Sequence, residues 1–250
     1  MTRLVGSELF KLRTTRTFYG VVAGALALVG VIAVGAAAAG TFGPGDRPGA
    51  DLLPIASLAQ TFALVLGILA VSTEFRHGTI TPSLLAVPSR ERLIGAKLVA
   101  HVLTGLLLGL AAYAMCAAIV SILLSVRGID LGVSGSDVTK IVVGGTLAAG
   151  LYAALGVGLG ALVRNQVGAV VGALGWVFIV EPLIAVIPGI SDAVQKYGLN
   201  GAGNALSATG FVQGSDAVLG QVAGGFLLLA YAAIFVVAGT LVMRRRDVSA

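Results

Sequence analysis

Charged residues are rare along most of this chain, and six apolar stretches are each long enough to cross a membrane. The stretches cover residues 18–40, 52–73, 98–126, 141–163, 167–187 and 217–243. About 20 consecutive apolar residues span a hydrocarbon core of roughly 30 Å as an α-helix. The strands of a β-barrel would instead alternate polar and apolar positions over about 10 residues. The pattern therefore predicts an all-α polytopic membrane protein with six transmembrane helices in a single domain, 1–250.

The composition agrees with this prediction. Hydrophobic residues make up 57% of the chain and charged residues 11%, whereas soluble domains average roughly 45–50% apolar and about 25% charged residues. The single cysteine, Cys116, lies in the third apolar stretch, so no disulfide can form within the chain. The net charge of +5 is concentrated between the apolar stretches, which is typical of a topology signal, and we expect no nucleic-acid partner.

The basic residues fall mainly in alternate connecting segments. Twelve of the 16 Lys and Arg residues would lie on one side of the membrane: Arg3, Lys11, Arg13, Arg16, Arg76, Arg90, Arg92, Lys97, Arg164, Arg244, Arg245 and Arg246. Short loops rich in Lys and Arg stay in the cytoplasm. We therefore predict that both termini are cytoplasmic and that the protein crosses the inner (plasma) membrane several times.

Residues 1–17 predict a short amphipathic helix. Leu4, Leu9 and Leu12 share one face at helical spacing, and Glu8 can pair with Lys11 three positions later. A basic amphipathic helix before a first span tends to lie on the anionic inner leaflet. The alternative is a charge cluster that only sets the orientation of the first span.

Two features are predicted at the outer side. Segment 188–216 contains Gly and Pro breaks and two apolar pieces too short to span, which predicts short re-entrant or interfacial helices. Just before it, Glu181 and Pro182 stand near the outer end of the fifth stretch. A carboxylate is costly inside a membrane, and proline tends to kink a helix. We interpret this pair as an outer gate or a hinge, and the residues alone leave the choice open.

The cytoplasmic segment 74–97 combines charged flanks with a short apolar helix. Thr81 can cap a helix whose first residue is Pro82 and which ends at Pro88. Ser89 can then cap the entry into the third span. Leu84, Leu85 and Val87 would be exposed between charges, which is typical of a docking surface for another protein. The alternative is an ordinary basic loop, which explains the charges but not the two prolines.

Glycine pairs spaced four residues apart occur at 20/24, 105/109, 156/160, 168/172 and 220/224. This spacing lets helices approach closely in lipid. Because the chain contains 36 glycines, several such pairs are expected by chance, and they predict only a tightly packed bundle.

Motifs for catalysis are missing from the sequence. It contains no G-x-x-x-x-G-K-[ST] nucleotide loop, no H-E-x-x-H or C-x-x-C metal motif and no G-x-S-x-G nucleophile motif. We therefore expect no enzyme activity, no metal and no cofactor in this chain. Ionisable groups are also rare in the apolar stretches, with His101 as one exception, although ion-coupled carriers usually need such groups to bind the coupling ion.

Residues 74–97, E-F-R-H-G-T-I-T-P-S-L-L-A-V-P-S-R-E-R-L-I-G-A-K, resemble the segment between spans two and three of ATP-binding-cassette (ABC) exporter permeases of the type-2 class. In that family the segment follows roughly E-x-R-x-G-T, an apolar helix, P-x-R and then A-K. The N-terminal S-E-L-F-K-L-R-T-T-R, the V-R-N-Q turn and the Glu-Pro pair are similar as well. With six spans, the resemblance covers essentially the whole chain.

The resemblance implies a permease subunit that forms a translocation pathway as a dimer, expected to be a homodimer, and that binds two ABC ATPase subunits. ATP and Mg would be bound by those partners. The residues that would couple the permease to the ATPase are Glu74, Arg76, Gly78, Thr79, Leu84, Leu85 and Pro88. The sequence does not identify the cargo, although an apolar pathway would suit a drug, a peptide or a lipid.

The residues alone leave two other functions open. One is a self-sufficient channel or ion-coupled secondary transporter, and the other is a membrane scaffold or sensor component.

Overall fold

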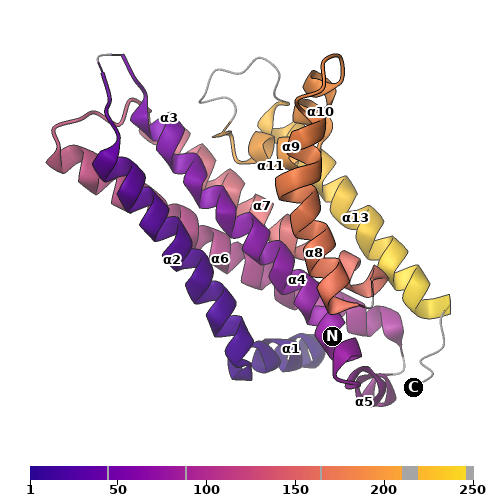
Figure 1. Ribbon diagram of the computed structural model, residues 1–250. Helices are drawn as coiled ribbons and strands as arrows, with labels where there is room; N and C mark the ends of the chain where they lie inside the picture. Colours follow the sequence, from indigo (N-terminus) through magenta and orange to yellow (C-terminus); the bar gives the residue numbers. More distant parts are fainter. Residues whose placement is uncertain (44, 88, 164, 210–218, 246–250) are drawn as a thin grey trace.

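A computed structural model of the chain describes residues 1–43, 45–87, 89–163, 165–209 and 219–245. Within these ranges the chain forms helices and turns and no β-strand (Figure 1). The helices are α1 (Thr2–Thr14), α2 (Arg16–Ala39), α3 (Pro48–Leu52), η1 (Leu53–Ser57), α4 (Leu58–Arg76), α5 (Ile80–Ala86), α6 (Arg90–Val126), α7 (Gly135–Leu162), α8 (Gln166–Gly175), η2 (Trp176–Val180), α9 (Glu181–Ile184), α10 (Ser191–Tyr197), α11 (Leu199–Leu206) and α13 (Gln221–Arg245).

Six helical segments among the described residues are long and apolar enough to cross a membrane, which confirms the predicted all-α architecture of a multi-pass membrane protein. They are Arg16–Ala39, Pro48–Arg76, Arg90–Val126, Gly135–Leu162, Gln166–Ile184 and Gln221–Arg244. The second segment runs through α3, η1 and α4, and the fifth runs through α8, η2 and α9. The predicted sixth stretch begins at 217, and its first two residues lie outside the described residues.

Helix α6 begins earlier than the hydropathy pattern predicts. The third apolar stretch starts at residue 98, but the helix starts at Arg90. The side-chain oxygen of Ser89 accepts a hydrogen bond from the backbone N–H of Arg92 at 3.4 Å, so the predicted capping role of Ser89 is confirmed. As a result Lys97 lies inside a helix, about two turns from its start, rather than in a connecting segment.

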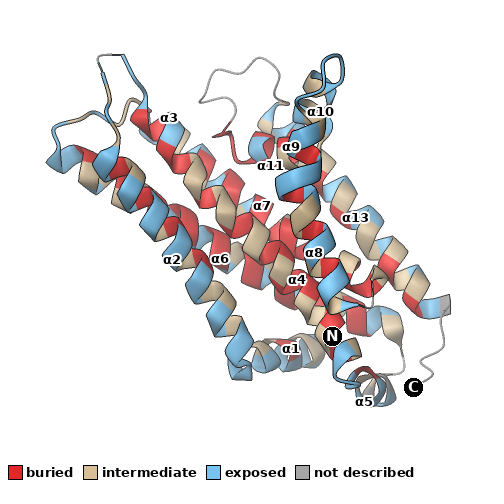
Figure 2. Ribbon diagram, in the orientation of Figure 1, coloured by how far each residue is buried: buried red, intermediate tan, exposed pale blue. Residues whose placement is uncertain are grey.

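Helix α7 occupies the centre of the bundle, where α4, α6 and α13 pack against it (Figures 1 and 2). Glycine makes the crossing with α4 possible. A Cβ atom on Gly156 would contact the carbonyl oxygen of Leu64, and one on Gly160 would lie 2.5 Å from the carbonyl oxygen of Ile68. The two backbones are therefore closer than any larger residue would permit at these positions.

The two ends of the bundle carry different short helices. At one end lie α1, α5, the start of α6 and the end of α13, and we call this the α5 end (Figure 1). At the opposite end lie α3, α10 and α11, and we call it the α10 end (Figure 1). The first helix and the last described helix therefore reach the same end, as an even number of spans requires.

Arginines tie α6 to neighbouring helices at both ends. Arg127, directly after α6, donates hydrogen bonds to the carbonyl oxygens of Ala37 at 2.5 Å and Gly40 at 2.8 Å. These contacts satisfy carbonyl groups at the C-terminal end of α2. At the α5 end, Arg90 donates to the carbonyl oxygen of Arg244 at 3.2 Å and so joins the start of α6 to α13.

Candidate functional site

Helix α5 is a short helix between the second and third spans, and it begins earlier than predicted. Thr79 is its N-cap residue and Ile80 its first helical residue, so Pro82 is the third. The prediction that Thr81 caps a helix starting at Pro82 is therefore wrong. The reason is Gly78, whose φ of +67° turns the chain immediately after α4. The turn also brings Ile80 into the bundle, where it is buried.

One face of α5 is open. Leu85 is 79% exposed. The hydroxyl of Ser83 donates to the carbonyl oxygen of Thr79 at 3.0 Å and steadies the first turn. Two predicted coupling positions, the side chain of Leu84 and the residue Pro88, lie outside the described residues. Of the predicted docking surface, Leu85 is therefore exposed, whereas Val87, directly after α5, is half-buried.

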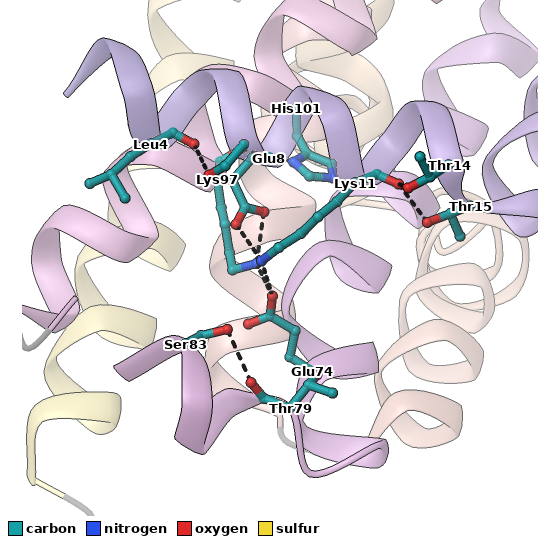
Figure 3. A network of polar contacts seen from close by, with 11 residues as sticks. Leu4, Glu8, Lys11, Thr14, Thr15, Glu74, Thr79, Ser83, Lys97 and His101 are labelled. Carbon is teal, nitrogen blue, oxygen red and sulfur yellow. Dashed lines mark hydrogen bonds and ion pairs between the residues drawn. The ribbon is translucent and has the colours of Figure 1, made fainter. Parts of the chain in front are cut away.

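Four charged side chains meet where α1, α4 and α6 come together, close to α5 (Figure 3). Nζ of Lys97 lies 2.7 Å from Oε1 of Glu74 and 2.9 Å from Oε2 of Glu8. Nζ of Lys11 lies 2.9 Å from the same Glu74 oxygen and 2.8 Å from Oε1 of Glu8. Two cations thus share two carboxylates. We call Glu8, Lys11, Glu74 and Lys97 the ion-pair network.

Three members of the ion-pair network are buried, and Lys11 is the one that is open to solvent. The side chain of Lys97 is 1% exposed and that of Lys11 is 49% exposed. Burial alone would raise the pKa of Glu8, but the charges of Lys97 and Lys11 outweigh burial and hold this pKa below its usual value. Burial would lower the pKa of Lys11, but its hydrogen bonds to Glu8 and Glu74 raise it overall. Glu8 and Lys11 are therefore charged at neutral pH.

The sequence predicts one part of this network but not the rest. The pair of Glu8 and Lys11 expected from their spacing is present. The family resemblance implies an ATPase contact for Glu74, and the charge pattern places Lys97 among orientation signals, whereas both are buried and paired within the chain. The overlooked signal is that the helical pattern of α6 extends back to its cap, which puts Lys97 one turn before His101 on a buried face.

The neighbouring polar residues make weaker or local contacts. Arg76, at the end of α4, donates from Nη1 to Oε1 of Gln166 at 3.5 Å and so reaches α8 rather than α5. His101 is buried beside the network, with Nδ1 2.9 Å from the carbonyl oxygen of Lys97. The structure thus gathers Glu74 and the Gly78 turn around α5 and directs Arg76 elsewhere.

The ion-pair network joins three helices that are distant in the sequence. Because α4 leads into α5 and α6 follows it, the pair of Glu74 and Lys97 closes the loop that carries α5. Glu8 adds α1 to the same cluster. Oε2 of Glu74 is buried and has no hydrogen-bond partner among the described residues, so one acceptor of the network is unused. The ion-pair network therefore links the helix ends on either side of α5 to α1.

At the α10 end, Glu181 ties the fifth span to α11. Glu181 is buried, and its Oε1 accepts a hydrogen bond from the backbone N–H of Asn200 at 2.7 Å. Nδ2 of Asn200 donates to the carbonyl oxygen of Val177 at 2.9 Å. A Cβ atom on Gly198 would contact Oε1 of Glu181, so the carboxylate occupies space that only glycine leaves free.

The fifth span changes its helical form just before Glu181. Residues Trp176–Val180 form a π-helical turn, a feature often found at functional sites. Pro182 is the second residue of the helix that follows, where its missing N–H costs little. Oε2 of Glu181 is buried without a hydrogen-bond partner among the described residues. The roles of Glu181 and Pro182 as a gate or a hinge stay predictions.

Within the described ranges, no group of three His, Cys, Asp or Glu side chains is placed to hold a metal ion. The chemistry at the α5 end consists instead of paired charges beside a short helix on which Leu85 is exposed. Comparison with models of known protein families gives no match for this sequence, and a search of curated proteins finds none that is similar to it.

Proposed function

We propose that this chain is the membrane-spanning permease subunit of an ATP-driven exporter of the ABC type. Two copies form the translocation pathway, and two separate ATPase subunits bind at the α5 end. Those subunits bind ATP and Mg²⁺ and carry out hydrolysis. The observation that carries the proposal is α5 itself, a short helix with the exposed Leu85, set between two spans whose ends are joined by a buried ion pair.

The proposal gives the bundle an orientation. The α5 end and both termini face the cytoplasm, because basic residues that favour this side gather there, among them Arg76, Arg90 and Arg244. Helix α1 then lies on the inner leaflet of the plasma membrane. Helices α10 and α11 lie at the outer surface, where Glu181 would act as a gate or hinge between α11 and the fifth span.

A coupling element needs a surface for its partner and a path into the membrane. Leu85 supplies an exposed apolar side chain of the kind that protein interfaces bury. The buried pair of Glu74 and Lys97 supplies the path, because it holds together the helices on either side of α5. Removing one partner of such a pair costs about 3–5 kcal/mol because it leaves a buried charge without its partner, so the two helix ends are favoured in contact.

The test is to express the tagged chain together with a candidate ABC ATPase encoded beside it and to purify the complex. We expect the two proteins to co-purify with ATP hydrolysis, and we expect Leu85→Asp to release the ATPase while the permease remains folded. Val126→Asp is the matched control. Val126 is 81% exposed, like Leu85, but lies at the other end of α6, and its replacement should leave the complex intact.

Two results would contradict the proposal. One is a complex that survives Leu85→Asp with normal ATP hydrolysis. The other is nucleotide-independent flux through the chain alone in liposomes, which would instead support a self-sufficient channel or an ion-coupled secondary transporter.

A further inference from the structure

A small polar cleft lies between α4, α7, η2 and α11, away from the ion-pair network. Its volume is about 250 Å³, slightly below the roughly 300 Å³ at which pockets for drug-sized ligands begin. Six polar residues line it: Ser57, Gln60, Thr61, Tyr152, Asn200 and Asn204. The cleft is therefore large enough for a compact polar group but not for a whole drug-sized molecule.

Several of these polar side chains have no protein partner. Hydroxyl groups elsewhere in the long helices bond to their own helix: Ser72 donates to a carbonyl oxygen one turn back at 2.8 Å, and Thr146 does so at 2.7 Å. The side chains of Ser57, Thr61 and Asn204 make no hydrogen bond to any described residue. Ser57 and Thr61 are half-buried and Asn204 is exposed, so their polar groups can be reached from the cleft. Three such groups at one cleft are available to donate hydrogen bonds to a ligand and to accept them from it.

The chemistry of the lining selects the kind of ligand. None of the residues that line the cleft is charged, so an ionic group placed there would lose hydration without gaining a counter-charge. Hydroxyl and amide groups both donate and accept hydrogen bonds, as sugar hydroxyls do. Phe178, which lines the cleft and is exposed, adds an aromatic face against which the apolar face of a sugar ring can pack.

We infer that this cleft binds an uncharged, polyhydroxylated group, such as the sugar head group of an amphiphile or a free sugar. The residues Thr61 and Asn204 contact the hydroxyls of that group, and Phe178 covers its apolar face. The inference concerns binding at the cleft alone and holds whether or not the chain is an exporter subunit.

The intrinsic fluorescence of Trp176 provides a direct test. It is the only tryptophan in the chain, and it directly precedes Val177, which lines the cleft. The full chain is reconstituted in phosphatidylcholine nanodiscs and titrated with octyl glucoside below its micelle concentration. Octyl sulfate and octyltrimethylammonium, which have the same alkyl chain, are titrated in parallel. We expect saturable binding of the glucoside and at least tenfold weaker binding of both charged amphiphiles.

Matched variants locate the binding site. Thr61→Val together with Asn204→Leu should weaken octyl glucoside binding at least tenfold, whereas Thr146→Val, which removes a hydroxyl outside the cleft, should leave it unchanged. Ser57→Ala provides a milder second variant if the double variant does not fold, as judged by its helical circular dichroism. Glucose, which lacks the alkyl chain, distinguishes a free sugar from an amphiphile as the ligand. If glucose binds as tightly as octyl glucoside, the ligand is a free sugar, and if glucose binds much more weakly, the ligand is an amphiphile.

Two outcomes would overturn the inference. One is equal binding of the neutral and charged amphiphiles, which would mean that the signal reports partitioning into the bilayer. The other is unchanged glucoside affinity in folded Ser57→Ala and Thr61→Val/Asn204→Leu proteins, which would place any sugar site elsewhere.

Discussion

Lys97 and Lys11 contact the same two carboxylates, but we expect very different costs when each is replaced by methionine. Each Nζ lies within 2.9 Å of an oxygen of Glu8 and of Glu74. Lys97 is almost fully buried, whereas half of the Lys11 side chain is open to solvent. Removing one partner of a buried ion pair costs about 3–5 kcal/mol, and the pairs of Lys11 contribute less because solvent reaches this lysine and screens them. Lys97→Met should therefore destabilise the fold several times more than Lys11→Met.

The free energy of unfolding can be measured by titrating purified variants in mixed micelles with SDS and following helix loss by circular dichroism. The variant Lys97→Met/Glu8→Gln is the matched control, because it removes one cation and one carboxylate and keeps the pair of Lys11 and Glu74. It should recover part of the stability lost in Lys97→Met. Equal losses in the two single lysine variants, or no recovery in the double variant, would refute the view that the cost comes from leaving two buried carboxylates with a single, partly exposed cation.

Three further predictions concern acid stability, helix packing and the α10 end. Because the pKa of Glu8 is lower in the folded protein than its unfolded value of about 4.3, ionised Glu8 stabilises the fold at pH values above about 4.3. This stabilisation is lost as the pH falls through the folded pKa, so Glu8→Gln should reduce the acid dependence of unfolding. Gly156→Ala should destabilise the fold by about 1–3 kcal/mol, because the added Cβ would meet the carbonyl oxygen of Leu64. The control is Gly24→Ala, whose Cβ would meet nothing within 4 Å, and it should leave the free energy of unfolding nearly unchanged in the same SDS titration. Glu181→Gln should reduce flux in liposomes more than recovery of the assembled complex if this carboxylate acts as a gate, and unchanged flux would favour a hinge.

The six long helices could be predicted from the sequence because the requirement for crossing a membrane is local. Each needs about 20 apolar residues in a row, and a hydropathy pattern records this directly. The start of α6 was harder to predict, because Arg90, Arg92 and Lys97 reduce the hydropathy of its first turns. The helix forms there nevertheless, because Ser89 caps it and nothing in those turns breaks it.

The contacts between helices could not be predicted, because they depend on which helices are neighbours. The glycine pairs 20/24 and 156/160 have the same spacing in the sequence. Only the second pair faces another helix closely, whereas nothing lies within 4 Å of a Cβ built on Gly20 or Gly24. Lys97 and Glu8 are likewise 89 residues apart, and no local pattern joins them.

The position of the ion-pair network decides how a force applied to α5 would spread. Short connections join α5 to α4 and to α6, and the pair of Glu74 and Lys97, 2.7 Å apart, bridges these two helices close to α5. Separating α4 from α6 at this end would break the buried pair of Glu74 and Lys97, which is unfavourable. Moving both helices together with α1 would break none of these contacts. Under the proposed function, an ATPase bound to α5 would therefore shift the ends of all three helices as one unit rather than open a gap between α4 and α6.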